Sequence, residues 1–182
     1  NTIVVTAMSG VAATLIGGRT IHSAVHLNKR LDNIPGSAVE DWRSTKMLIV
    51  DEISFASRED IEKLEKRVSH LKDTRNKNYG NIDVIFCGDM RQLEPVTPSA
   101  TKIYQEPFIE FHGMINCYIE LKGQHRFKND KAWGLLLTRY RDGELTEEDI
   151  DMINSRLIND ETVIPDNISY ATYTNIDRAS VN

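Results

Sequence analysis

The residues Met47-Leu48-Ile49-Val50-Asp51-Glu52 form an apolar run that ends abruptly in two carboxylates. A second apolar run, Val84-Ile85-Phe86-Cys87, ends in a similar way at Gly88-Asp89. Continuous apolar runs of this length are typical of strands buried in the centre of a parallel sheet. Between the two runs, apolar residues recur at helical spacing, at Ile61, Leu64, Val68 and Leu71. The sequence therefore predicts a β-α-β unit in which one amphipathic helix joins two parallel strands.

The rest of the chain shows the same alternation, which predicts an α/β fold with a parallel sheet covered by helices. Further strands are expected at 3–6, 118–121 and 168–174, and further helices at 10–13, 20–27, 130–140 and 146–157. The last of these helices opens with Thr146-x-x-Asp149, the pattern of a capping box. Residues 73–81 are polar and rich in Asn and Lys, so we expect a loop there.

Composition sets wide limits on function. The chain has 182 residues, 40% hydrophobic and 27% charged, which predicts a globular protein of one domain, or one domain and part of a second. Its net charge of −5 argues against binding to nucleic acid through bulk positive charge, but leaves a local basic groove possible. No apolar run approaches the roughly 18 residues of a membrane span, so no membrane partner is expected.

The two cysteines, Cys87 and Cys117, lie in apolar stretches and lack C-x-x-C spacing. Buried, reduced thiols are the expected state, in preference to a disulfide or a metal site. This favours an intracellular, reducing compartment, with nucleus, cytoplasm and mitochondrion left open.

The acidic strand ends are the candidate site, because open α/β sheets bind ligands at the carboxyl ends of their strands. Of the adjacent Asp51 and Glu52, one can hold Mg²⁺ while the other orients a water molecule. For this dipeptide alone, two solvated acids at a strand-to-loop junction would be the commoner interpretation. The second strand end favours a functional site instead, because Gly88-Asp89 is followed by Gln92 near the same edge. Two such strand ends joined by one helix are typical of a nucleotide hydrolase.

Five blocks of sequence, in order, resemble the motifs of superfamily 1 DNA helicases of the Pif, RecD and Dda type. Residues 47–54 resemble the Walker B or DExx motif, residues 88–96 resemble motif III, and residues 6–13 with 16–23 resemble motif Ia. Residues 121–130 with Arg141-Asp142-Gly143 resemble motif IV and the helix after it, and residues 171–175 resemble the return of the chain into a second domain. Any single block would be a weak match, whereas the ordered set is specific.

This resemblance implies a RecA-like core of the P-loop NTPase class, with domain 1A at residues 1–144 and a linker helix and the beginning of domain 2A at residues 145–182. It implies that Asp51 coordinates Mg²⁺, that Glu52 activates the attacking water, and that Gln92 senses the γ-phosphate of ATP. Arg126 would act as an arginine finger, although Phe127 stands where the family commonly has Gln. Without the motif, a surface ion pair would be the preferred interpretation of Arg126.

The resemblance also implies contacts between motif Ia and single-stranded or forked duplex DNA, through Thr6, Ser9, Gly10 and His22. Small polar residues let a backbone approach phosphates closely. From spacing alone, a plain strand-to-helix turn capped by Ser9 is equally good, and RNA stays an open alternative. By resemblance, the parent protein would be a monomer that moves 5′ to 3′ in DNA replication, recombination or repair.

One family motif is absent. A P-loop requires Gly-x-x-x-x-Gly-Lys-[Ser/Thr], and this sequence contains no Gly-Lys pair. Gly18-Arg19-Thr20 is similar to the end of that motif, but Ala13 occupies the position of its first glycine. In the family, the P-loop precedes motif Ia, so we expect a truncated core that lacks the first strand and the P-loop and is inactive alone. The alternative is a non-hydrolysing DNA-binding or regulatory remnant.

Two other features have simpler interpretations. His22 and His26 have the spacing of zinc-protease ligands, but Ser23 replaces the required Glu and no third ligand follows, so zinc is not expected. Trp42 and Trp133 are candidate stacking platforms for bases, yet packing in a core or an interface is the commoner role.

Overall fold

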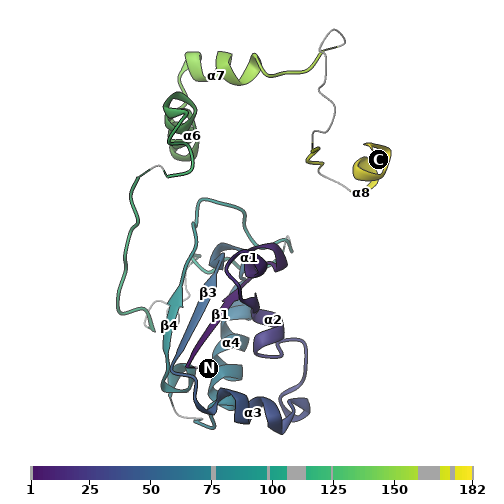
Figure 1. Cartoon of the computed structure of the whole chain (residues 1–182), viewed down its shortest axis with the longest axis vertical. Helices are drawn as coiled ribbons and strands as arrows, with labels where there is room; N and C mark the ends of the chain where they lie inside the picture. The colour runs from purple at the N-terminus through teal and green to yellow at the C-terminus, as the bar shows by residue number, and fades with distance from the viewer. Residues whose placement is uncertain are drawn as a thin grey trace. The chain divides into compact units, whose positions relative to one another are not determined.

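The computed structural model describes residues 2–74, 77–97, 99–105, 114–123, 125–159, 169–172 and 175–181. The chain forms two compact units, Asn1–Leu121 and Lys122–Asn182 (Figure 1). This division falls earlier in the chain than the boundary predicted between residues 144 and 145. No helix within the described ranges is long and apolar enough to cross a membrane.

The first unit is built on a four-stranded parallel sheet with the order β2-β1-β3-β4. Its strands are β1 (Ile3–Ala7), β2 (Arg19–Thr20), β3 (Met47–Asp51) and β4 (Asp83–Phe86). Helix α4 (Arg58–Leu71) joins β3 to β4, which confirms the predicted β-α-β unit. Ala7 pairs with both Thr20 and Asp51, so three strands end at one level of the sheet.

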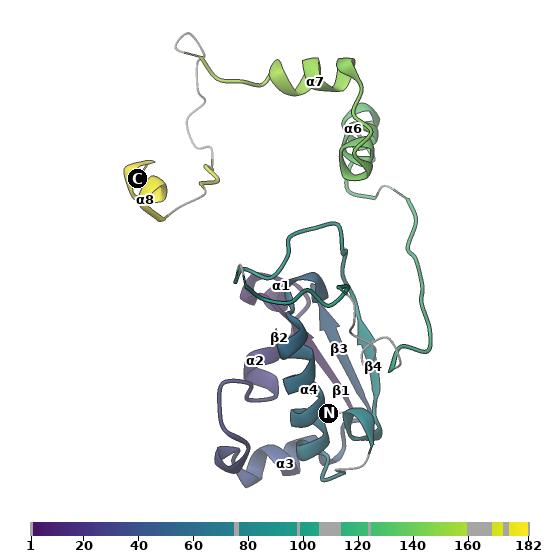
Figure 2. The same cartoon turned by 180° about the vertical axis from the view of Figure 1, so that it is seen from behind.

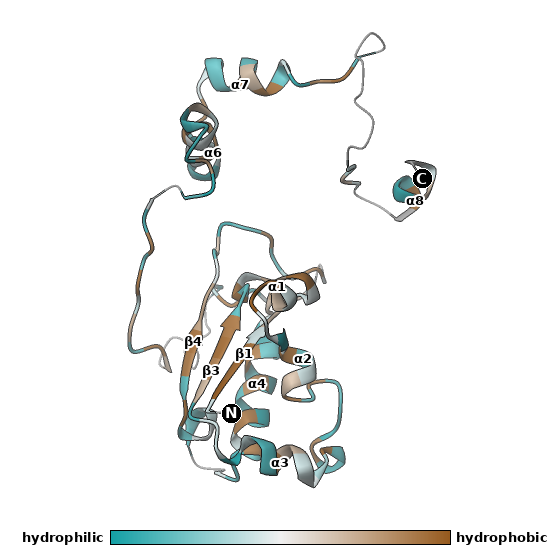
Figure 3. Ribbon diagram, viewed as in Figure 1, coloured by the Kyte–Doolittle hydropathy of each residue, from teal (hydrophilic) through white to brown (hydrophobic). Residues whose placement is uncertain are grey.

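Helices cover one face of this sheet. Helices α2 (Ile21–Ala24), α3 (Gly36–Arg43) and α4 lie on that face, as the two opposite views show (Figures 1 and 2). Their apolar residues form one buried cluster with Leu48 and Val50 of β3. On the other face, Ile3 and Ile85 are 49% and 43% exposed. Strands β1, β3 and β4 are largely hydrophobic, as Figure 3 shows.

Local signals explain where the helices begin. Ser57 Oγ accepts a hydrogen bond from the Asp60 amide, and the Asp60 carboxylate accepts one from the Ser57 amide, so α4 opens with a complete capping box. Ser9 caps α1 (Gly10–Leu15) in the same position, without the reciprocal bond. The helix predicted at 20–27 is shorter than expected, because the chain leaves α2 at Val25 and His26 has a left-handed φ of 54°.

Two strand predictions are wrong for the described residues. Residues 118–121 form no strand, and Tyr118, Ile119 and Leu121 are 82%, 77% and 92% exposed. A strand forms only against a partner that satisfies its amides and carbonyls, and none of the described strands offers one to this segment. Strand β4 was expected in the centre of the sheet. Because no described strand pairs with its outer side, it is an edge strand among the described elements. Of the strand expected at 168–174, residues 168, 173 and 174 lie outside the described residues, and 169–172 form no strand.

Short elements complete the first unit. The 3₁₀ turns η1 (Leu31–Asn33), η2 (Ile53–Phe55) and η3 (Asn78–Asn81) follow α2, β3 and α4 respectively. Helix α3 and strand β2 were not predicted, because neither has a clear apolar period. Helix α3 is fixed by Trp42, which is buried and donates from its indole nitrogen to the Ala24 carbonyl at 3.2 Å. Trp42 therefore packs in the core.

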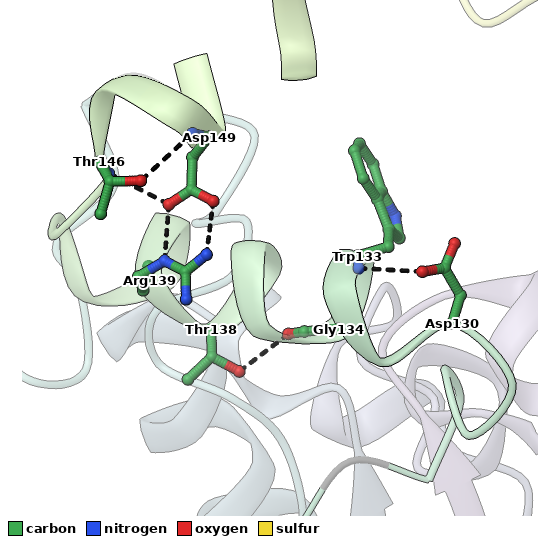
Figure 4. A network of polar contacts seen from close by, with 7 residues as sticks. All are labelled: Asp130, Trp133, Gly134, Thr138, Arg139, Thr146 and Asp149. Carbon is green, nitrogen blue, oxygen red and sulfur yellow. Dashed lines mark hydrogen bonds and ion pairs between the residues drawn. The ribbon is translucent and has the colours of Figure 1, made fainter. Parts of the chain in front are cut away.

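The second unit contains α6 (Lys131–Asp142), α7 (Glu147–Asn154) and α8 (Asn175–Val181). The first two confirm the predicted helices, including the capping box of Thr146 and Asp149. Figure 4 shows how α6 and α7 are joined: Arg139 donates from Nε and Nη2 to the two Asp149 oxygens, at 2.6 and 2.5 Å. These bonds hold the pKa of the Asp149 carboxyl well below its usual range. Asp130 caps α6 by accepting from the Trp133 amide.

The cysteines differ from each other in exposure. Both are free thiols, but only Cys87 is partly buried, whereas Cys117 is exposed. The expectation of burial is therefore wrong for Cys117, which lies in the segment that forms no strand.

Candidate active site

The carboxyl end of β3 places Asp51 and Glu52 at the edge of the sheet, both partly buried. Asp51 Oδ1 accepts a hydrogen bond from the Glu52 amide at 2.9 Å. Glu52 adopts a left-handed conformation with φ 57° and ψ 43°, which is unfavourable for a residue with a side chain. Such strained residues cluster at functional sites, where the surrounding structure holds them in place. Here the turn places two adjacent carboxylates directly at the end of β3.

The turn after β3 is joined to the turn after β4 at the level of the backbone. The Ile53 amide donates to the Cys87 carbonyl at 2.9 Å, and the Cys87 amide donates to the Val50 carbonyl at 2.8 Å. Gly88 lies against this junction, where an added Cβ would come within 2.9 Å of the Ile53 nitrogen. The two acidic strand ends of the sequence are therefore brought together, as predicted.

Asp89 fixes the position of Gln92. The Gln92 amide donates to the Asp89 carbonyl at 2.9 Å, and its side-chain nitrogen donates to Asp89 Oδ2 at 3.4 Å. Asp89 Oδ1 also accepts from the Arg91 amide at 3.0 Å, so the carboxylate organises the whole turn. Sequence reasoning gave Asp89 no role of its own. The signal was its type and position, since aspartate commonly bonds to the backbone two residues further on in turns.

The segment after Gln92 is anchored to the start of α4. Ser57 and Lys102 form an antiparallel bridge, and the Arg58 amide donates to the Thr101 carbonyl at 2.8 Å. Glu94 accepts from both Lys102 Nζ and Tyr104 OH at 2.5 Å. These two hydrogen bonds lower the pKa of the Glu94 carboxyl. The loop that carries Gln92 is thus held at both of its ends.

Asp51 is suited to a divalent cation. Within the described part of the chain, no hydrogen bond or ion pair engages its Oδ2 atom. Magnesium is usually held by one or two carboxylates together with substrate phosphates, so a single free carboxylate oxygen fits that ion. The negative charge of Asp51 also acts on the neighbouring Cys87. Burial and the Asp51 carboxylate together raise the pKa of the Cys87 thiol.

The segment after β1 lies beside the same strand end. The Met8 amide donates to the Asp51 carbonyl at 3.0 Å, which ties this segment to the acidic turn. Ser9 caps α1, as the plain structural interpretation required, and Gly10 is exposed with no atom within 4 Å of an added Cβ. His22 is partly buried in α2. Ser9 and Gly10 therefore follow this edge of the sheet directly, and His22 lies in the helix that begins where β2 ends.

Thr6 is the exception, and its predicted role needs correction. Its side chain is fully buried and donates to the Ile49 carbonyl at 2.7 Å. The hydroxyl is therefore used inside the sheet, between β1 and β3, and is not available to a ligand at the surface.

The stretch Gly17-Gly18-Arg19-Thr20 does not have the geometry of a P-loop. A P-loop runs from a strand into a helix, but this stretch runs from α1 into β2. Gly18 is required for a different reason, because an added Cβ would come within 2.4 Å of the Val5 carbonyl oxygen. Arg19 and Thr20 are then paired with β1.

Arg126 belongs to the second unit, and its side chain is exposed there. The structure thus joins the turn that follows Asp51 and Glu52 to the turn that leads to Gln92.

The parallel sheet, the acidic turns at its carboxyl edge and the connecting helix define a RecA-like α/β domain. The particular family follows from sequence comparison, since the profile of the PIF1-like helicases matches residues 1–114. This chain belongs to the PIF1-like helicase family.

Relatives agree with this assignment. The ATP-dependent DNA helicase PIF1 of Candida albicans is 30% identical over 200 residues, which cover 98% of this chain and 22% of the relative. The protein of the same name from Danio rerio is 35% identical over 155 residues, covering 79% and 24%. The chain thus spans about a quarter of the length of the curated relatives it matches.

Solved structures share the fold. The crystal structure of the Candida albicans Pif1 helicase has a TM-score of 0.78 at 29% identity, covering 98% of this chain and 43% of that one. A Bacteroides Pif1 helicase in complex with ADP-AlF3 and single-stranded DNA has a TM-score of 0.67 at 20% identity, covering 87% and 41%. The second likeness concerns the fold alone.

Proposed function

We propose that this chain supplies the ATP-hydrolysing and DNA-contacting residues of an ATP-dependent DNA helicase. The names of its relatives support this activity. The observation that carries the proposal is the backbone junction at the carboxyl edge of the sheet, where Ile53 bonds to Cys87 and Met8 bonds to Asp51. This junction joins the acidic turn to both the Gln92 turn and the segment before α1. The residues proposed for ATP hydrolysis and those proposed for contact with DNA are therefore connected through this one backbone junction.

In this proposal each residue at the edge has one role. Asp51 holds Mg²⁺, which neutralises charge on the phosphates of bound ATP. Glu52, on the adjacent left-handed residue, accepts a proton from the attacking water. Gln92, oriented by Asp89, donates to or accepts from the γ-phosphate region. Phosphoryl transfer depends mainly on positioning and charge stabilisation, which a rigid turn of this kind provides.

Arg126 is proposed as the arginine finger. Its planar guanidinium can bind two phosphate oxygens at once, and its exposure in the second unit leaves it available for that contact.

DNA is proposed to bind along the segment that contains Ser9, Gly10 and His22. The open space at Gly10 allows a phosphate to approach the backbone, and Ser9 can still donate its hydroxyl proton while it caps α1. A Bacteroides Pif1 was solved bound to single-stranded DNA, and another Pif1 structure concerns unwinding at forked double-stranded DNA, which supports the same partners here. We propose 5′-to-3′ movement by a monomer.

The test uses a chimera in which a segment carrying a Gly-x-x-x-x-Gly-Lys-[Ser/Thr] loop precedes this chain. Glu52→Gln should leave Mg-ATP binding intact and reduce turnover by at least about 10²-fold, because the general base is lost while the charge on Asp51 stays. Glu59→Gln, an exposed acid on α4, is the matched control and should keep full activity.

Turnover that persists in Glu52→Gln would remove the assignment of this residue. A chimera that binds DNA but hydrolyses no ATP, even with the loop present, would instead favour the non-hydrolysing DNA-binding remnant.

A further inference from the structure

A pocket of about 510 Å³ lies at the amino-terminal edge of the sheet. Thr45 and Lys46 line it just before β3 begins, and Ile82 and Asp83 line it at the start of β4. Asp51 stands at the other end of β3, about 15 Å away along the strand at the usual rise per residue. The pocket is therefore separate from the candidate active site.

Positive charge surrounds this pocket. Its lining includes four cationic side chains and a single acid, namely Arg43, Lys46, Lys72, Lys77 and Asp83. Arg43 also pairs with Glu40 at 3.0 Å, so part of its charge is already neutralised. Lys46 and Lys77 are exposed, and no ion pair engages them among the described residues. The pocket keeps an excess of positive charge, which favours an anion.

Lys72 neutralises backbone carbonyls on one side of the pocket. Its ammonium group donates to the carbonyls of Trp42, Arg43 and Thr45, at 3.1, 2.9 and 2.8 Å. These carbonyls carry the partial negative charge of the carboxyl end of α3, which would otherwise repel an anion. With its three protons in use, Lys72 contributes charge and leaves direct donation to its neighbours.

Two hydroxyl groups in the lining lack a partner. Thr45 is only 1% exposed, and its Oγ1 atom is buried with no hydrogen bond. Thr74 Oγ1 is buried in the same condition, on a partly buried residue. An unpaired buried hydroxyl lowers stability, so native proteins nearly always satisfy such groups. Both threonines line the pocket, so a ligand that entered it would be the nearest candidate partner for these two buried hydroxyls.

The wall beyond Lys72 is fixed. The Gly80 amide donates to Ser69 Oγ at 3.1 Å, and Ser69 Oγ donates to the Lys77 carbonyl at 3.1 Å. Gly80 packs so closely that an added Cβ would come within 2.5 Å of the Lys72 Cβ. A preformed pocket binds with a smaller loss of conformational entropy.

We propose that this pocket binds a phosphate group, held by the hydroxyls of Thr45 and Thr74 and by the charges of Lys46 and Lys77. Phosphate offers several acceptor oxygens and a negative charge, which match two unpaired donors and two unengaged ammonium groups. The group comes either from a nucleic-acid backbone or from free inorganic phosphate, since both present the same oxygens. In either case the site is a second anion site on the edge of the sheet opposite to Asp51.

The experiment titrates the chain with inorganic phosphate at constant ionic strength, using NMR shifts of the amides of residues 45, 46, 74 and 77. Saturable shifts are expected in the wild-type chain. The affinity should fall about tenfold or more in Thr45→Val and in the double variant Lys46→Gln/Lys77→Gln, because each loses donors or charges that contact the anion. Lys63→Gln/Lys66→Gln, two exposed lysines on α4, is the matched control with the same change in net charge.

Thr45→Val guards against an effect of misfolding. It removes an unpaired buried hydroxyl, so without phosphate its melting temperature should equal or exceed that of the wild type. Absence of saturable shifts in the wild type, retained affinity in Thr45→Val, or an equal loss in the Lys63/Lys66 control would each overturn the proposal.

A second arm identifies the source of the phosphate. A single-stranded oligonucleotide that binds more weakly to the Lys46/Lys77 variant than to the Lys63/Lys66 control assigns the pocket to a nucleic-acid backbone. Unchanged oligonucleotide binding, together with lost phosphate binding, assigns it to free phosphate.

Discussion

Gly88 lies directly against the backbone of Ile53, so that a Cβ at position 88 would come within 2.9 Å of the Ile53 amide nitrogen. That amide is already bonded to the Cys87 carbonyl, so it cannot move away without breaking the junction. The turn that follows Asp51 and the turn that leads to Gln92 therefore depend on the absence of a side chain at one residue.

Gly88→Ala should destabilise the chain by about 1–3 kcal/mol, the usual cost of forcing extra atoms into a packed site. The melting temperature measures this change. Gly10→Ala is the control, because no atom lies within 4 Å of its added Cβ and it occupies the first position of α1. That variant should be neutral or slightly more stable. Equal melting temperatures for Gly88→Ala and Gly10→Ala would contradict the close packing described here.

Much of the first unit could be predicted from periodicity. Apolar residues mark the elements that form the core. They form continuous runs within β3 (Met47–Asp51) and β4 (Asp83–Phe86), and they recur at helical spacing within α4 (Arg58–Leu71). The carboxyl ends of parallel strands meet at one edge, so the sequence also predicted that the turns after Val50 and Cys87 would be neighbours, as their backbone hydrogen bonds confirm. The role of Asp89 was missed because a hydrogen-bonded turn leaves only a weak signal in residue type.

Other features depend on contacts that a single sequence does not encode locally. Tyr118, Ile119 and Leu121 have the composition of a strand, but a strand exists only where a partner strand pairs with it. Thr6 looks like a surface hydroxyl in a small polar loop, whereas the register of β1 against β3 turns it toward the Ile49 carbonyl. A shift of one residue in that register would have turned Thr6 to the other face.

Single-stranded DNA should bind weakly to this chain, and the affinity should fall steeply as salt increases, because a few phosphate contacts dominate on an acidic protein. Gly10→Val should weaken binding several-fold, since its side chain fills the open space beside the backbone. His22→Ala should do the same, while His70→Ala, at the end of α4, is the control. Fluorescence anisotropy at several salt concentrations measures all three. Unchanged affinity in both test variants would leave Ser9 and its neighbours with a capping role alone.

The joint between α6 and α7 should weaken in acid. Arg139 holds the pKa of Asp149 below its usual range, so this carboxylate stabilises the folded unit at pH values above its unfolded pKa, about 3.9. As the pH falls below about 4 and then through the lower folded pKa, this stabilisation is lost. Amide NMR signals of α6 and α7 should therefore lose dispersion on acidification. Asp149→Asn should weaken the joint already at neutral pH, and Asp151→Asn, an exposed acid on α7, serves as the control. An identical acid response in Asp149→Asn and wild type would refute the role of this ion pair.

The chain of residues 1–182 should show no measurable ATPase activity, and calorimetry with Mg-ATP should give no saturable heat at sub-millimolar concentration. ATP binding in this class of protein needs backbone amides and a lysine to offset the charge of the triphosphate, and the sequence has no Gly-Lys pair to supply them. Asp51 and Glu52 add negative charge at the edge, which repels the nucleotide unless Mg²⁺ intervenes. The stretch from Gly17 to Thr20 cannot substitute, because Gly18 is packed against the Val5 carbonyl and Arg19 and Thr20 are paired with β1. Tight binding of Mg-ATP that is lost in Arg19→Ala would show that this stretch does form a phosphate cradle, and its assignment to the DNA-contacting segment would then be wrong.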